Sequence, residues 1–204
     1  MYLDSINLQY KGIQNRMKKI DRRVLRTQES LGNALVDLTL EIGYEAITIK
    51  ELTQTASIGY ATFFRHFKSK DELLMFVLQS VLEDLFNSMT PDMSPYDQAV
   101  VMFEYVKNNS RTYRVFIDIP RDSELYNAAY VSIADSIRKN YISRDEDHIP
   151  LEVAVNHIVT SITELIRWWI INDMEISPEK MAIIQSDLII KATEIVALDR
   201  VTAD

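Results

Sequence analysis

The chain has 204 residues, 47% of them hydrophobic, and carries a formal net charge of −8. This composition supplies a core for one large domain or two small ones and argues against wholesale disorder. Cysteine is absent, which excludes disulfides, zinc–thiolate sites and thiol nucleophiles. No apolar run approaches the ~18 residues of a transmembrane helix. The N-terminus lacks a secretory signal, so we expect a cytoplasmic protein with no membrane partner.

Four glycines and five prolines are few for this length. Long helices with short connections fit that scarcity better than sheets with many turns, so we predict an all-α fold.

Charge is distributed unevenly along the chain. Residues 1–75 hold 11 Lys and Arg against 9 Asp and Glu, whereas residues 76–204 hold 11 against 21. Between residues 10 and 28 a single acid, Asp21, is opposed by Lys11, Arg16, Lys18, Lys19, Arg22, Arg23 and Arg26. Such asymmetry indicates either a surface for nucleic acid or membrane, or a solvated helix face. We therefore treat residues 1–21 as a basic N-terminal arm.

A first helix is predicted over residues 22–42, because apolar residues recur there at three- and four-residue spacing: Leu31, Ala34, Leu35, Leu38 and Ile42. Gly43 follows, where a left-handed C-cap would end the helix. Thr48-Ile49-Lys50-Glu51 has the form of a capping box, in which Thr48 accepts from the Glu51 amide. A short helix should therefore run from Thr48 to about Ala56.

A second short helix is predicted from Tyr60 to Phe67, after a tight turn at residues 57–59. We expect Gly59 to take the dihedral angles that most residues avoid there. Ser69-Lys70-Asp71-Glu72 is a second capping box, and it opens a longer helix with one apolar stripe, Leu74, Leu78, Val81 and Leu85. The two short helices and their turn have the spacing of a helix-turn-helix.

The segment IGYATFFRHFKSK (residues 58–70) admits three interpretations: a packed core helix, a metal or catalytic site around His66, or a surface that meets a polyanion. The three histidines, at positions 66, 148 and 157, lack metal-site spacing, so we predict no metal site. The three phenylalanines cannot all face solvent, and we expect at least two to be buried. A plain helical core and DNA binding both remain open on the spacing alone.

The C-terminal part, residues 76–204, reads as a second helical domain. Ser94-Pro95 and Ser177-Pro178 each place an N-cap serine before a first-turn proline. Helices are predicted at about 95–109, 111–119, 122–141, 151–172 and from 178 onward, with a charged loop at 144–150. The helix after Leu151 carries a nearly unbroken apolar stripe: Val155, Ile158, Val159, Ile162, Leu165, Ile166, Trp169 and Ile170.

The last helix carries two apolar stripes, one of Met181, Ile184, Leu188, Ala192 and Ile195, the other of Ile183, Ile190 and Ala197. Two stripes exceed what one core needs, so we expect a homodimer through the last two helices. Trp169 continues the core stripe, and Trp168 either meets the partner or covers the helix surface. The candidate interface residues are Ile162, Ile166, Trp168, Ile183 and Ile190.

Aromatic residues of the middle helices are either core or the wall of a ligand pocket. The pocket candidates are Phe103, Tyr113, Phe116, Tyr126, Tyr130 and His157. His157 lies on an apolar helix, so a satisfied core histidine is the simpler interpretation. No Ser-His-Asp set, Gly-rich phosphate loop or paired carboxylates stand out, so we predict neither an enzyme nor a cofactor.

The stretch TIKELTQTASIGYATFFRHFKSKDELL (residues 48–74) resembles the DNA-binding signature of the TetR family of bacterial transcriptional regulators. The similarity is strong over about residues 22–75, and RWWIINDMEISPEK (residues 167–180) resembles the family's penultimate helix and the start of its last. Four positions depart from the family pattern. Ser57 replaces the turn glycine, and Gly59 replaces the turn serine or threonine. Tyr60 stands at the first position of the recognition helix, which is often small or basic in the family, and Phe64 replaces a tyrosine whose hydroxyl commonly reaches a phosphate.

The resemblance implies a homodimeric regulator with a DNA-binding domain at residues 22–75 and a ligand-binding and dimerisation domain at 76–204. Its partner would be double-stranded operator DNA, contacted by Thr48, Gly59, Tyr60, Ala61, Thr62, Arg65, His66 and Lys70. We expect a repressor that a small-molecule effector releases from its operator. The alternative is a protein of the same fold that acts mainly through protein–protein interaction and binds DNA weakly. The acidic C-terminal half favours a neutral or cationic effector.

Overall fold

The computed structural model describes residues 22–90, 92–117, 119–145 and 148–201. The predicted basic arm, residues 1–21, lies outside the described residues. The chain divides into two compact units, one reaching Phe76 and the other beginning at Val77. The division falls inside one helix, α5 (Lys70–Asn87), and each unit is described separately below.

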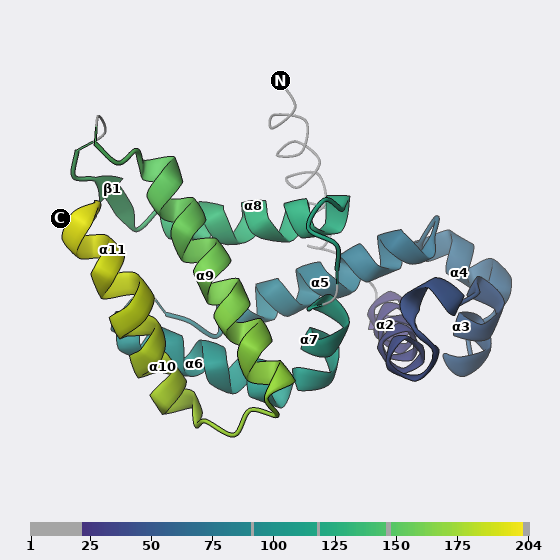
Figure 1. The fold of residues 1–204 in the computed structure, drawn as a ribbon. Helices are drawn as coiled ribbons and strands as arrows, with labels where there is room; N and C mark the ends of the chain where they lie inside the picture. Colours follow the sequence, from purple (N-terminus) through teal and green to yellow (C-terminus); the bar gives the residue numbers. More distant parts are fainter. Residues whose placement is uncertain (1–21, 91, 118, 146–147, 202–204) are drawn as a thin grey trace. The chain divides into compact units, whose positions relative to one another are not determined.

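The first unit is a small helical bundle built around a helix-turn-helix. It contains, in chain order, α2 (Arg22–Ile42), a 3-10 turn (Tyr44–Ala46), α3 (Ile49–Thr55), α4 (Tyr60–His66) and the start of α5 (Figure 1). Its core consists of fully or almost fully buried side chains: Leu31, Leu35, Leu52, Phe63, Phe67 and Leu73. Phe63 and Phe67 are buried, whereas Phe64 is 46% exposed. The prediction that at least two of the three phenylalanines are buried is confirmed.

The bounds of α2 match the predicted helix, and Gly43 ends it with a positive φ of 81°. The ψ of Gly43 is 145°, outside the left-handed helical region, so the predicted left-handed C-cap is wrong in its second angle. Glycine is still the residue that tolerates this φ without strain.

The second unit consists of the rest of α5 and the helices that follow it: α6 (Pro95–Asn108), α7 (Ser110–Phe116), α8 (Glu124–Arg138), α9 (Leu151–Ile171), α10 (Pro178–Gln185) and α11 (Lys191–Val196). Ser94 Oγ accepts from the Asp97 amide at 3.1 Å, and Ser177 Oγ accepts from the Lys180 amide at 3.3 Å. Both predicted Ser-Pro helix starts are confirmed.

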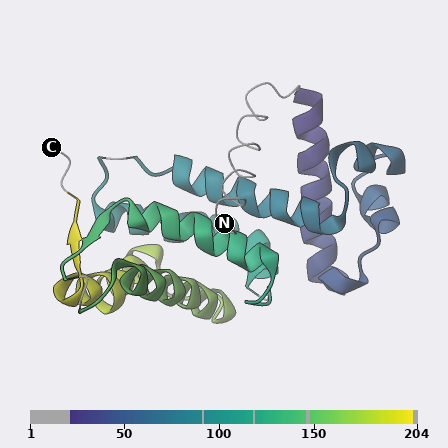
Figure 2. The same cartoon turned by 90° about the horizontal axis from the view of Figure 1, so that it is seen from above.

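The helix predicted to reach residue 141 ends earlier. α8 stops at Arg138, and Tyr141 begins a short strand, β1 (Tyr141–Ser143), that pairs antiparallel with β2 (Leu198–Arg200). Figure 2 shows this two-stranded ribbon at the C-terminal end of the described chain. Leu198 and Tyr141 are buried, so the ribbon closes the apolar core at that end of α9.

Trp169 forms the centre of the main core of this unit. It is fully buried, stacks edge-on against Phe103 with ring centroids 5.3 Å apart, and donates from Nε1 to the Ile176 carbonyl at 2.8 Å. Met181 and Ala182 of α10 complete this cluster. The predicted core role of Trp169 is confirmed.

The last helix is interrupted by a π-helical segment, Ser186–Ile190. Because π hydrogen bonds span one more residue than α bonds, the segment shifts the phase of everything after it. From Gln185 onward the buried positions of this helix are Gln185, Ile189, Thr193 and Ala197, whereas Leu188 and Ile195 are 70% and 71% exposed. The two stripes predicted by regular α periodicity are therefore wrong beyond Ile184.

Within the described ranges, none of the helices combines the length and apolar character needed to cross a bilayer.

The burial contrast between Phe63 and Phe64 leads to a stability prediction. Phe63→Leu removes ring contacts from a fully buried site and should lower the free energy of unfolding by about 1–2 kcal/mol. Phe64→Leu, the matched control at an exposed neighbour, should change it by less than about 0.5 kcal/mol. Urea denaturation followed by circular dichroism measures both, and equal effects would contradict the assigned packing.

Candidate DNA-binding surface and ligand cavity

The capping box at the start of α3 forms as predicted. The Thr48 hydroxyl accepts from the Glu51 amide at 3.2 Å, and the Glu51 carboxylate accepts from the Thr48 amide at 2.9 Å and from the Thr48 hydroxyl at 2.7 Å. Hydrogen bonds from the Thr48 hydroxyl and amide hold the pKa of Glu51 below its ordinary value. A phosphate reaching Thr48 would therefore compete with a charged carboxylate for its hydroxyl.

The turn between α3 and α4 places its strain at a different residue from the one predicted. Ser57 has φ 55°, in the left-handed region, whereas Gly59 has φ −65° and ψ 138°, which any residue adopts. The prediction that Gly59 takes the unusual dihedral angles is wrong. The Gly59 carbonyl accepts from the amides of Thr62 and Phe63 at 2.8 and 3.2 Å, so Gly59 is the N-cap of α4, without a side chain to assist.

The outward side of α4 combines aromatic and basic groups. Tyr60 is 56% exposed and meets the ring of Phe64, one turn on, at a centroid distance of 5.2 Å. Arg65 donates from Nη2 to the Thr62 hydroxyl at 2.7 Å, which fixes the direction of its guanidinium. Ala61 is also exposed. α4 thus presents a small, apolar and cationic surface while Phe63 holds its other side in the core.

His66 closes α4 and is half-buried. Burial, and secondarily the charge of Arg65, hold the pKa of His66 below its ordinary value. The ring is therefore uncharged at neutral pH, and it can exchange hydrogen bonds with a ligand without contributing a full charge.

Lys70 is turned toward its own chain. Its ammonium donates to the carbonyls of Tyr44, Glu45 and Ile47 at 2.9, 3.3 and 3.4 Å and lies 4.4 Å from the centre of the Tyr44 ring. The Tyr44 hydroxyl also donates to Asp71. These contacts fasten the loop after α2 to the start of α5.

The box at the start of α5 is only half formed. Ser69 Oγ accepts from the Glu72 amide at 3.1 Å, but the Glu72 carboxylate accepts from the Lys68 amide, at 2.6 Å, instead of from the Ser69 amide.

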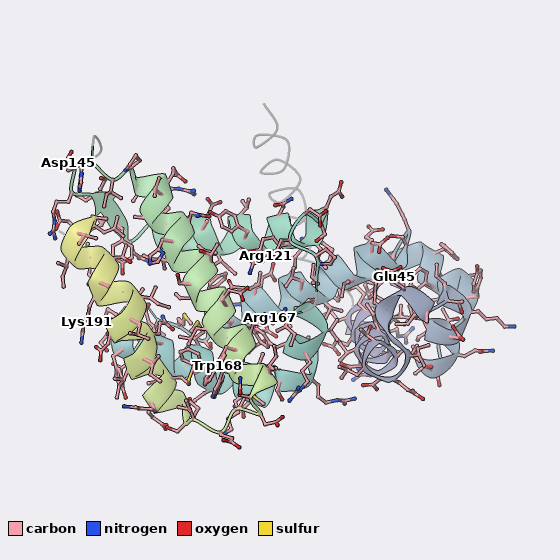
Figure 3. The ribbon with its side chains drawn as sticks, in the orientation of Figure 1. Glu45, Arg121, Asp145, Arg167, Trp168 and Lys191 are labelled. Carbon is pink, nitrogen blue, oxygen red and sulfur yellow. The ribbon has the colours of Figure 1, made fainter. Side chains whose placement is uncertain are left out.

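A cavity of about 400 Å³ lies within the second unit. Its walls come from α5, α7, the loop after α7, α8 and α9, and they are mainly apolar. The lining side chains with polar groups are Tyr113, Arg121, Tyr126, Tyr130, Thr163, Glu164 and Arg167. Arg121 donates to Glu164, and Arg167 donates to the Ile117 carbonyl. Figure 3 labels Arg121, just before α8, and Arg167, on α9.

Four of the six pocket candidates line this cavity: Tyr113, Phe116, Tyr126 and Tyr130. Phe103 does not line it, because its ring is buried against Trp169. His157 is exposed on α9, so the interpretation as a core histidine is wrong; its Nδ1 lies 3.5 Å from the Ser161 hydroxyl. Arg121, Glu164 and Arg167 were not among the candidates, because nothing in a surface-like Arg or Glu marks it as cavity-lining.

An apolar face is exposed on the last two helices. It includes Val153, Trp168 and Ile171 on α9, and Ile183, Leu188, Ile195 and Val196 on the α10–α11 segment. Two of the five candidate interface residues, Trp168 and Ile183, are on it. The other three pack against side chains of their own chain: Ile166 beside Trp169, and Ile162 and Ile190 beside Ile158 and Ile189.

Two family models match the chain. "Bacterial regulatory proteins, tetR family" matches residues 33–75, and "Transcriptional regulator C-terminal region" matches residues 93–191. The helix-turn-helix of the first unit and the helices of the second are thus both regions of a transcriptional regulator. The chain belongs to the TetR family of bacterial transcriptional regulators, a family of regulators and not of enzymes.

Relatives and solved structures agree with this assignment. The chain is 38% identical over 85 residues to the uncharacterized HTH-type transcriptional regulator YxbF of Bacillus subtilis (41% of this chain, 22% of YxbF). It thus spans about a fifth of the length of that relative. It is 27% identical over 180 residues to the HTH-type transcriptional activator FasR of Mycolicibacterium smegmatis (81% of this chain, 80% of FasR).

The solved structure of SmeT, the repressor of the Stenotrophomonas maltophilia multidrug efflux pump SmeDEF, shares the fold with a TM-score of 0.61. It is 15% identical and covers 84% of this chain and 90% of SmeT. Proteins similar to this chain thus include both an activator and a repressor.

The strain at Ser57 leads to a second prediction. Ser57→Gly removes the side-chain carbon that disfavours φ 55°, a gain of about 1–2 kcal/mol, partly offset by the larger entropy of glycine in the unfolded chain. We expect a net increase of about 0.5–1 kcal/mol in the free energy of unfolding. Ser57→Ala keeps that carbon and should change little. A loss of stability in Ser57→Gly, measured by urea denaturation, would show that the turn is not strained at this residue.

Proposed function

We propose that this chain is a homodimeric repressor that binds double-stranded operator DNA and is released by a small-molecule effector. The observation that carries the proposal is α4: a seven-residue helix anchored by Phe63, with Tyr60, Thr62 and Arg65 on its outward side. A short helix that projects such side chains suits the major groove. The proposal places the protein in the cytoplasm, with its DNA.

Each side chain on this surface has a role in the proposal. Arg65, oriented by Thr62, binds a base edge or a phosphate. Tyr60, Ala61 and Phe64 offer apolar contact to thymine methyl groups. Thr48 and Gly59 bring the starts of α3 and α4 to the phosphates, and His66 adds an uncharged hydrogen-bonding ring. The ammonium of Lys70 serves the loop after α2, so the proposal assigns it to positioning.

The exposed apolar face of α9 and α10–α11 supports the homodimer. Trp168, Leu188 and Ile195 are large apolar side chains that are 49%, 70% and 71% exposed, and a partner that covers them would remove apolar surface from water. Two copies would bring two α4 helices to half-sites one helical turn, ~34–36 Å, or a multiple of it apart.

The cavity supports an effector. Leu78, Val81 and Leu82 of α5 line it, and α5 begins at Lys70 in the DNA-binding unit. A ligand that prefers one position of α5 would shift the population of DNA-competent dimers by its differential affinity. The sign of regulation rests on the resemblance alone, and FasR is named an activator, so a reporter fused to the chain's own promoter decides between repression and activation.

DNA binding is tested by footprinting on the chain's own promoter and by affinity measured from about 50 to 200 mM salt. We expect a discrete protected site and a steep loss of affinity with salt. Arg65→Gln should weaken binding and, if the Arg65 of each subunit meets one phosphate, make the log–log slope for the dimer shallower by about 1.8. Lys70→Gln, which removes the same charge from the same unit, should leave the slope near that of the unaltered protein.

Absence of any specific footprint would reject the proposal. It would favour the second candidate function, a protein-interaction role, for which the exposed rings of Tyr60 and Phe64 would be the contact surface.

The dimer is tested separately by light scattering at micromolar concentration. The unaltered protein should have twice the chain mass, and Leu188→Glu or Trp168→Glu should reduce it to one chain, because each buries a charge in an apolar contact. Leu40→Glu, at an exposed apolar residue of α2, is the matched control and should stay dimeric. A monomeric unaltered protein would contradict the assignment.

A further inference from the structure

We propose that the cavity of the second unit takes an amphipathic carboxylate, with its apolar body inside and its acid group held by Arg121 and Arg167. The inference rests on the proposed function in that it names the effector class for the same cavity. It runs against the sequence-based expectation of a neutral or cationic effector.

The cavity suits an apolar body. Its volume of about 400 Å³ falls within the ~300–1,000 Å³ of small-molecule sites. Aliphatic side chains form the walls on three helices, for example Leu82 on α5, Ile133 on α8 and Val159 on α9. Such a lining gains free energy by removing hydrocarbon from water, and it does so without regard to the exact shape of the chain or ring.

The charged groups of the lining favour an anion. Two arginines, Arg121 and Arg167, face a single acid, Glu164, in the described lining. The cavity therefore has a positive balance inside a chain whose net charge is −8. The negative charge of the molecule lies elsewhere, so it does not predict the charge preference of this site.

The contact between Arg121 and Glu164 is one that a ligand can replace. Both side chains are largely exposed, 64% for Arg121 and 49% for Glu164, and a solvated ion pair of this kind shifts an equilibrium by no more than about five-fold. A ligand carboxylate whose body is buried beside Arg121 would exchange one carboxylate partner for another. The exchange costs little, and burial of the ligand body offsets it.

Arg167 and two tyrosines complete the polar side of the site. Arg167 is anchored by the Ile117 carbonyl, and a guanidinium has five N–H donors in a planar fork that matches a carboxylate. The hydroxyls of Tyr113 and Tyr126 make no hydrogen bond to any residue in the described part of the chain. Burial raises the pKa of Tyr113, so its phenol stays protonated and can donate to an anion.

The test is calorimetric titration of the full-length protein, without DNA, with three decyl probes below their aggregation concentrations: decanoate, decanol and decyltrimethylammonium. A second acid–alcohol pair with a phenyl group covers an aromatic body. One or two charge-assisted hydrogen bonds should make an acid bind about 10- to 100-fold more tightly than its alcohol. The ammonium probe should bind no better than decanol.

Three variants locate the acid group. Arg167→Gln should lower decanoate affinity about ten-fold and Arg121→Gln up to about five-fold, each with decanol affinity unchanged, while Glu164→Gln should raise decanoate affinity a few-fold. Arg114→Gln is the matched control, because Arg114 pairs with Asp173 away from the cavity. Circular dichroism checks that each variant is folded, and the decanol affinity serves as an internal control for an intact cavity.

Equal binding of acid and alcohol, unchanged decanoate affinity in both arginine variants, or failure of both acids to bind would each overturn the inference. These outcomes are independent of the footprint. If the protein protects its operator but does not bind carboxylates, only this inference is refuted. If it binds carboxylates but protects no DNA, the proposed function is refuted.

Discussion

Two seven-residue helices, α3 and α4, form the helix-turn-helix, and neither is long enough to persist in water alone. They exist because Leu52 and Phe63 are completely buried. Everything on the outward side follows from that anchoring: Phe63 fixes the rotation of α4, and the rotation decides that Tyr60, Phe64 and Arg65 face solvent. The capping box of α3 and the Lys70 contacts then hold the flanking loops, so a small apolar core determines where the few functional side chains point.

The sequence predicted best those features that depend on local chemistry. The bounds of α2, the Thr48–Glu51 box and the two Ser-Pro helix starts each depend on residues within one turn of each other, and all were correct. Burial of Trp169 also followed from helical periodicity, and burial of at least two of the three phenylalanines followed from their crowding on one short helix. Features that depend on distant contacts were missed. No local sequence pattern around Tyr141 predicts a strand, because the strand forms by pairing with Leu198–Arg200, more than fifty residues away.

Other misses have their own physical causes. Gly59 attracted the prediction of an unusual backbone because glycine tolerates it, yet the tertiary structure imposes positive φ on Ser57 instead. Side chains lining the cavity could be predicted only in part: aromatic residues suggest a wall, but Arg121 and Arg167 look like ordinary surface charges until the fold brings the loop before α8 next to α9. Net charge by domain likewise hid the local excess of arginine.

The π-helical segment Ser186–Ile190 joins α10 to α11 through hydrogen bonds that span one residue more than those of an α-helix. Because this turn already holds one residue more than an α-helical turn, deleting a single residue there would leave an ordinary α turn and keep Gln185 and Thr193 on the buried side of the helix. A deletion within α11 would instead turn every later residue by about 100°. The π-helical segment is therefore a place in the last helix where the chain length can change by one residue without turning buried side chains toward solvent.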